Sequence, residues 1–129
     1  MLFEHITKVH KGLICGYAFF YTLAALTTIY ALQFPKYFYE YNPITATLFS
    51  QIGMIPTLLA VGFVTIVAMT IIPYLFRQSE YTGIFLNSII VLVIGLDSGN
   101  NIYHLTNIQF LWFCDQGMNL LYMVRYGLV

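Results

Sequence analysis

Four polar residues lie at the end of a long apolar run in the second half of the chain. Their types and spacing could support chemistry. Asp97, Asn100, Asn101 and His104 stand at positions i, i+3, i+4 and i+7, which places them on one face of a helix. A carboxylate near lipid is costly and needs a partner. We expect these residues to cap the helix, meet headgroup water or hold a nearby loop. A contact with a partner subunit and the handling of an ion, proton or substrate are the alternatives.

A second polar group is the segment Glu40-Tyr41-Asn42-Pro43. Asn-Pro often starts a turn, so an interfacial turn is the simpler interpretation. The expected topology places this segment on the same side of the membrane as Asp97. Glu40 and Asn42 are therefore also candidates for a polar network that satisfies groups on the third helix.

Small residues recur at the spacing that lets two membrane helices approach closely. Gly12 and Gly16 form one GxxxG pattern, and Gly95 and Gly99 form another. We expect these glycines to lie at helix contacts, where they help the helices pack.

Metal and catalytic motifs are not found in the sequence. His5 and His10 precede the first apolar run, and His104 follows the third, so no two histidines face each other at mid-membrane depth to hold haem. Cys15 and Cys114 lie in apolar runs without a CxxC partner. We therefore predict no metal, no cofactor and no independent catalysis.

The composition determines the class of protein. Of 129 residues, 60% are hydrophobic and 8% are charged, and the mean hydropathy of +0.78 excludes an ordinary water-soluble domain. Five basic and five acidic residues balance, so no basic surface is available for nucleic acid. The sequence predicts an all-α, polytopic transmembrane bundle that forms a single domain over residues 1–129.

The spans follow from the gaps between charged residues. We predict membrane-spanning helices at about 12–32, 56–76 and 82–101, each long enough to cross about 30 Å of hydrocarbon. A short helix over 44–51 is expected to lie on the membrane before the second span. The segment 106–126 has mixed polarity and predicts a fourth helix, either membrane-inserted or interfacial.

The orientation follows from the basic residues. Lys8 and Lys11 precede the first span, and Arg77 lies between the second and third spans, on the same side. Lys36 is the opposing charge. The positive-inside rule then predicts a multi-pass protein of the cell membrane with a cytoplasmic N-terminus.

Three motifs together resemble a known family. They are Ala24-Ala25-Leu26-Thr27-Thr28, Glu40-Tyr41-Asn42-Pro43, and Asp97 with Asn100-Asn101 at the end of the third span. Over about residues 17–101 the chain is similar to small three-span prokaryotic membrane proteins of unknown function. That family has a threonine-containing first helix, an acidic residue shortly before Asn-Pro, and an asparagine closing the third span. The resemblance implies architecture and no particular activity.

We expect a non-catalytic accessory or structural subunit of a larger integral-membrane complex, which helps assembly by helix packing. Respiratory complexes and copper-dependent membrane monooxygenases use small chains of this kind, so the host is expected to be energy-conserving or oxidising. The expected partners are other integral-membrane subunits and the lipid bilayer, and a homo-oligomer is left open. The alternative is a small oligomeric transporter of the minimal drug/proton exchanger type.

Overall fold

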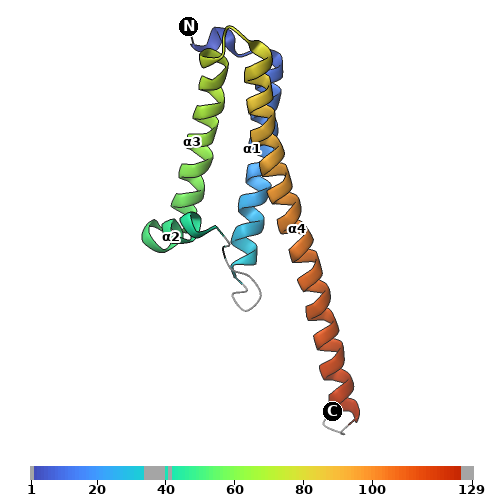
Figure 1. Cartoon of the computed structure of the whole chain (residues 1–129). Coiled ribbons are helices and arrows are strands. Elements are labelled where there is room, and N and C mark those ends of the chain that lie inside the picture. Colours follow the sequence, from blue (N-terminus) through green and yellow to red (C-terminus); the bar gives the residue numbers. More distant parts are fainter. Residues whose placement is uncertain (1, 34–39, 41, 126–129) are drawn as a thin grey trace.

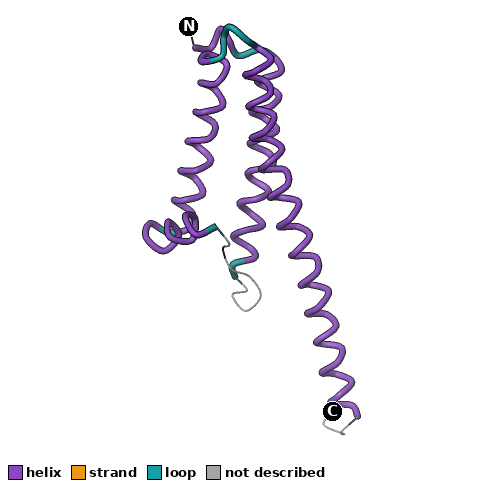
Figure 2. Tube along the Cα trace, viewed as in Figure 1, coloured by secondary structure: helices purple, strands orange, loops and turns teal. Residues whose placement is uncertain are grey.

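The computed structural model describes residues 2–33, 40 and 42–125, with side chains described as far as residue 107. These residues form a 3-10 helix η1 (Leu2–His5) and the helices α1 (Lys8–Ala31), α2 (Pro43–Ile52), α3 (Met54–Leu75) and α4 (Glu80–Arg125). Figure 1 shows α1 and α4 running in the same direction and α3 running in the opposite direction. The described part of the chain is helical apart from short connections, as Figure 2 shows. The predicted all-α fold is confirmed there.

Three helices are long and apolar enough to cross a membrane. They are Lys8–Ala31, Met54–Leu75 and the first part of α4, Glu80–Asn107, with mean hydropathies of 1.6, 2.4 and 1.7. The shortest, α3, has 22 residues and is therefore about 33 Å long, which matches the hydrocarbon thickness. The three predicted spans are therefore confirmed as helices that are long and apolar enough to cross a membrane. The third is longer than expected, because it continues past residue 101.

The structure corrects the expectation of a separate fourth helix over 106–126. The backbone continues α4 without a turn from Glu80 to Arg125, a length of 46 residues or about 69 Å. Residues 101–116 include neither glycine nor proline, so the sequence carries no strong signal to end the helix there. The side chains beyond Asn107 lie outside the described residues, as does the backbone of residue 126. In Figure 1, α4 extends well beyond the ends of α1 and α3.

The short helix expected before the second span is present as α2. Asn42 caps its N-terminus, and the side-chain oxygen accepts hydrogen bonds from the backbone N–H groups of Ile44 (3.0 Å) and Thr45 (3.4 Å). Gly53 separates α2 from α3 at φ +94°, a conformation that residues with a Cβ atom rarely adopt. One asparagine cap and one glycine corner therefore place α2 across the end of α3.

The cap predicts a measurable loss of stability. We expect Asn42→Ala to lower the free energy of unfolding by about 1 kcal/mol, because two backbone donors lose their acceptor. Asn42→Ser keeps a capping oxygen and is expected to stay within a few tenths of a kcal/mol of the wild type. Thermal unfolding of the purified protein in detergent measures both. Equal losses in the two variants would show that the cap does not stabilise α2.

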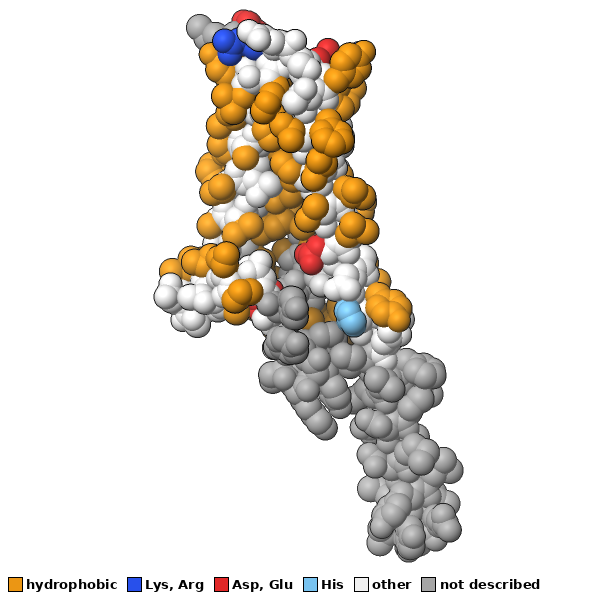
Figure 3. Space-filling view, in the orientation of Figure 1, with side chains coloured by type: hydrophobic (Ala, Val, Ile, Leu, Met, Phe, Trp, Pro, Cys, Tyr) orange, Lys and Arg blue, Asp and Glu red, His pale blue; other side chains and the backbone are white. Residues whose placement is uncertain are grey.

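The interior of the bundle is small and unusually polar. Among the described residues, the buried apolar side chains are Tyr17, Ala24 and Met69. The buried polar ones are His10, Thr57, Asn87 and Ser98. Figure 3 shows hydrophobic side chains covering the visible face of the bundle, with Lys and Arg gathered at the end where the N-terminus lies. An apolar exterior around a partly polar interior is the pattern expected for helices dissolved in lipid.

One glycine of each GxxxG pattern faces the contact between α1 and α4. A Cβ atom placed on Gly16 lies 3.8 Å from Val91 Cγ1, and one on Gly95 lies 4.0 Å from the ring of Phe20. Gly12 and Gly99 have no neighbouring atom within 4 Å of such a Cβ. The structure therefore places only the inner glycine of each pair beside the neighbouring helix.

Candidate functional site

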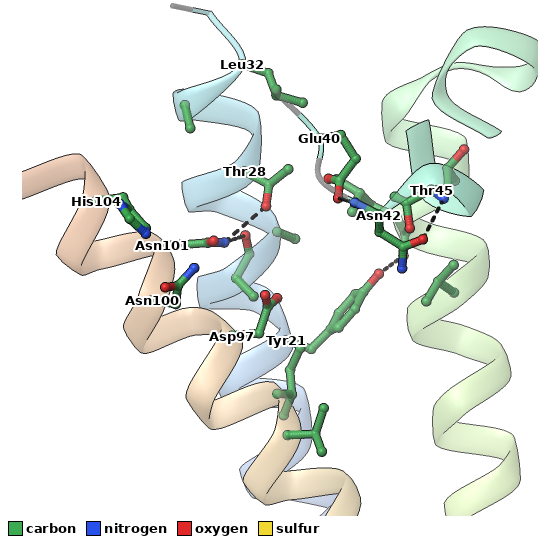
Figure 4. Close-up of a pocket in the computed structure, with 18 residues that line it drawn as sticks. Tyr21, Thr28, Leu32, Glu40, Asn42, Thr45, Asp97, Asn100, Asn101 and His104 are labelled. Atoms are coloured by element: carbon green, nitrogen blue, oxygen red, sulfur yellow. Dashed lines mark hydrogen bonds between the residues drawn. The ribbon is translucent and has the colours of Figure 1, made fainter. Parts of the chain in front are cut away.

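A cavity of about 860 Å³ opens at the end of the bundle where α2 lies. Alanine, leucine, valine and isoleucine side chains from α1, α3 and α4 form its apolar walls. Figure 4 shows the residues that surround it, and its polar side chains come from all four helices and from the segment leading into α2. Its polar lining residues are Tyr21, Thr28, Glu40, Asn42, Thr45, Thr57, Asp97, Asn100, Asn101 and His104.

The four residues selected on the third span all line this cavity, but only one of them joins the helices directly. Asn101 donates from Nδ2 toward Thr27 Oγ1 and Thr28 Oγ1, both at 3.2 Å, and toward the Ala24 carbonyl at 3.4 Å. These acceptors lie on α1, so the asparagine ties α4 to the threonine-containing part of the first helix. Asn100 and His104 are exposed.

Glu40 and Asn42 line the same cavity from the opposite wall. Glu40 Oε1 accepts a hydrogen bond from the Asn42 backbone N–H at 3.0 Å, and the Asn42 side chain caps α2. Among the described residues, the hydrogen bonds of these two side chains stay within their own segment. The fold brings the two predicted polar groups to one cavity, and no direct hydrogen bond in the described part joins Glu40 or Asn42 to α4.

Asp97 lies further from the end of its span than its position in the sequence indicates, and its side chain is exposed on the described part of the chain. Gly95 faces Phe20 across the α1 and α4 contact. Asp97, two residues further along α4, is therefore at the level of Thr22, near the middle of α1. The sequence placed Asp97 near the end of its span, where a carboxylate caps a helix at little cost. The structure places it within Glu80–Asn107, the part of α4 that is long and apolar enough to cross a membrane.

Tyr21 forms the inner boundary of the cavity. Its hydroxyl donates to the Leu58 carbonyl on α3 at 2.5 Å, and its ring stacks on Tyr17 with 5.4 Å between centroids. The ring also lies directly on Gly62, where a Cβ atom would be 2.6 Å from Tyr21 Cε1. Gly62 was not among the residues predicted from the sequence. The available signal was a single glycine inside an otherwise apolar span, which often marks a close approach of another group.

A second polar cluster lies nearer the N-terminal end of the bundle. Asn87 Nδ2 is 3.1 Å from His10 Nδ1 and donates to the Met69 carbonyl at 3.1 Å, and Asn87 Oδ1 is buried without a hydrogen-bond partner. Asn87 is 0% exposed and His10 is 1% exposed. The cluster joins α1, α3 and α4. Sequence reasoning placed His10 before the first span and passed over Asn87, although an amide inside the apolar run 84–96 was a usable signal.

Beside this cluster is a smaller cavity of about 160 Å³, lined partly by His5, His10, Glu4 and Glu80. Within the described ranges, no three His, Cys, Asp or Glu side chains are arranged to hold a metal ion. The chemistry that the described side chains offer is therefore hydrogen bonding in the buried cluster and a carboxylate-containing cavity at the other end.

Comparison with known proteins found no matching family model, no matching curated protein and no matching solved structure. The resemblance noted from the sequence therefore extends only to three membrane-spanning helices.

Proposed function

We propose that this protein is a non-catalytic subunit of a larger integral-membrane complex. In this role α1, α3 and α4 insert in the bilayer, and the projecting part of α4 binds neighbouring subunits. Because Lys8, Lys11 and Arg77 are at one end of the bundle, the N-terminus is cytoplasmic and the large cavity opens on the opposite side.

The main support for this proposal is the length of α4. A helix of about 69 Å is more than twice the thickness of the hydrocarbon core, and its first part, Glu80–Asn107, is by itself long enough to cross that core. The following residues still include Leu111, Trp112 and Phe113, which water solvates poorly. A single helix projecting from a bundle gains little stability from propensity alone. Packing against another polypeptide supplies the missing contacts and covers the apolar residues.

Co-purification tests the proposal. The affinity-tagged full chain, extracted from its own membranes in mild detergent, is expected to bring other integral-membrane proteins with it in a fixed ratio. A variant that ends at Asn107 keeps all three spans, so it is expected to insert and purify as a single species but to lose those proteins. A full-length chain that purifies alone, as a monomer or a homo-oligomer, would contradict the proposal.

The second candidate is a small oligomeric transporter. The position of Asp97 favours it, because a carboxylate that faces a cavity inside a membrane span often marks a transport path. A purified homodimer that releases protons when a substrate is added would support this candidate over the first.

A further inference from the structure

The large cavity has the dimensions and wall chemistry of a small-molecule site. Its volume of about 860 Å³ falls within the range of about 300 to 1,000 Å³ that is usual for ligand pockets. Its walls combine apolar side chains from three spans with ten polar residues, so the cavity can contact both the apolar and the polar part of a ligand. Four elements contribute to the lining, so the cavity is a product of the whole bundle.

Asp97 brings an unpaired carboxyl group into this cavity. The carboxylate makes no hydrogen bond or ion pair with any residue that the structure describes. In Figure 4, Asp97 lies between α1 and α4 at the level of Tyr21. Ionisable groups at membrane depth are costly and are normally paired, so a cation in the cavity would supply what the described polypeptide does not.

The other residues that line the cavity also favour a positively charged ligand. Glu40 contributes a second carboxylate, which its hydrogen bond to the Asn42 backbone holds at the cavity wall. Among the described lining residues there is no lysine or arginine, and His104 is the only basic side chain. The described lining therefore offers two carboxyl groups and one imidazole, a set that favours a cation over an anion.

The apolar walls determine what kind of cation fits. In the described part of the chain, no three His, Cys, Asp or Glu side chains come together as ligands of a small metal ion. An organic cation instead presents apolar groups to Val61, Val93 and Ile94 while its charge approaches Asp97. We propose that the cavity binds a lipophilic organic cation, with an ammonium-type or phosphonium-type charge against the Asp97 carboxylate.

Equilibrium binding of labelled tetraphenylphosphonium to the full chain in an uncharged maltoside detergent tests this inference. We expect saturable binding of one cation per chain, with no competition from tetraphenylborate, which has a similar shape and the opposite charge. Asp97→Asn is expected to weaken binding by about tenfold or more, since a charge-assisted contact is lost. Glu40→Gln is expected to weaken it by only about two- to threefold, because this carboxylate is nearer the bilayer surface.

Two further variants show whether a loss of binding results from the missing charge or from misfolding. Asp97→Glu keeps the charge and is expected to bind within about threefold of the wild type. Glu80→Gln removes a carboxylate at the other end of the bundle, beside the smaller cavity, and is expected to bind as the wild type does. The inference would be overturned if the wild type did not bind the cation, if tetraphenylborate competed equally, or if a folded Asp97→Asn variant bound unchanged.

One additional measurement identifies the source of the cation. Displacement of the probe by added phosphatidylethanolamine would support the inference and assign the site to a lipid ammonium headgroup. Binding unaffected by that lipid would support it and assign the site to a soluble amphiphile. The inference concerns binding to the isolated chain, so its failure would leave the proposed role in a larger complex unchanged.

Discussion

Gly62→Ala is expected to lower the free energy of unfolding of the bundle by about 1 to 3 kcal/mol, the usual cost of overpacking a tightly filled site. The new methyl group would be 2.6 Å from Tyr21 Cε1 and 3.1 Å from Tyr21 Cδ1, both well inside contact distance. Elsewhere in a helix the same substitution is favourable, because alanine has a higher helix propensity than glycine. The sign of the effect therefore depends on this one contact.

The ring of Tyr21 has little freedom to move away. One face stacks on Tyr17, which is 3% exposed, and the hydroxyl is bonded to the Leu58 carbonyl. Moving the ring would break that hydrogen bond or push Tyr17 outward, and moving the backbone would separate α1 from α3. We therefore expect the strain to appear as a loss of stability and not to be absorbed by a local adjustment.

Two glycines offer matched controls for this prediction. Gly12→Ala and Gly99→Ala add the same methyl group at helical positions with no neighbouring atom within 4 Å, so neither is expected to destabilise the protein. In a Tyr21→Ala background, Gly62→Ala should cost little, since the clashing ring is gone. Denaturation of the purified variants in detergent measures all four. A similar loss for Gly62→Ala with and without the ring would refute the steric explanation.

Asn87→Asp is expected to cost more, about 3 kcal/mol or above, because it places a carboxylate where a neutral amide is fully buried. The new oxygen would also face the Met69 carbonyl at a position now occupied by an N–H donor 3.1 Å away. Two acceptors in contact repel each other, and neither is exposed to water. The variant should therefore unfold at a much lower denaturant concentration than the wild type.

Two other variants separate the effect of the buried charge from the effect of the lost hydrogen bonds. Asn87→Leu removes both hydrogen bonds and leaves His10 Nδ1 without its partner, which is expected to cost about 1 to 3 kcal/mol. Asn107→Asp makes the same chemical change at an exposed position on the same helix and should have little effect. If Asn87→Asp were no worse than Asn87→Leu, burial of charge would not be the reason for the loss.

The sequence predicted the helices that local properties determine. The spans follow from charge-free runs whose length matches the bilayer, and the helix 44–51 follows from Asn42-Pro43 before it and Gly53 after it. The end of the third span was less predictable. Polarity rises after Asp97, which indicated a boundary, whereas helix continuation depends on the absence of glycine and proline over 101–116.

The candidate site was predictable in part. Helical spacing alone put Asp97, Asn100, Asn101 and His104 on one face, and the order of the spans put Glu40 on their side of the membrane. Spacing did not show that Asn101 would be the residue bonded to α1 while Asp97 faces the cavity. That difference arises from how far α4 is rotated and shifted against α1, which the packing of Gly16 against Val91 and Gly95 against Phe20 sets.

By itself, the sequence determined that this chain has three segments long and apolar enough to cross a membrane, because few charges interrupt them. It also determined which segments are helical, since backbone groups in hydrocarbon must be satisfied within each span. Only the tertiary structure decided which polar groups are paired, because Tyr21, Gly62, His10 and Asn87 meet through contacts between residues far apart in the chain. It likewise decided the depth of Asp97, since depth depends on the register of α4 against α1.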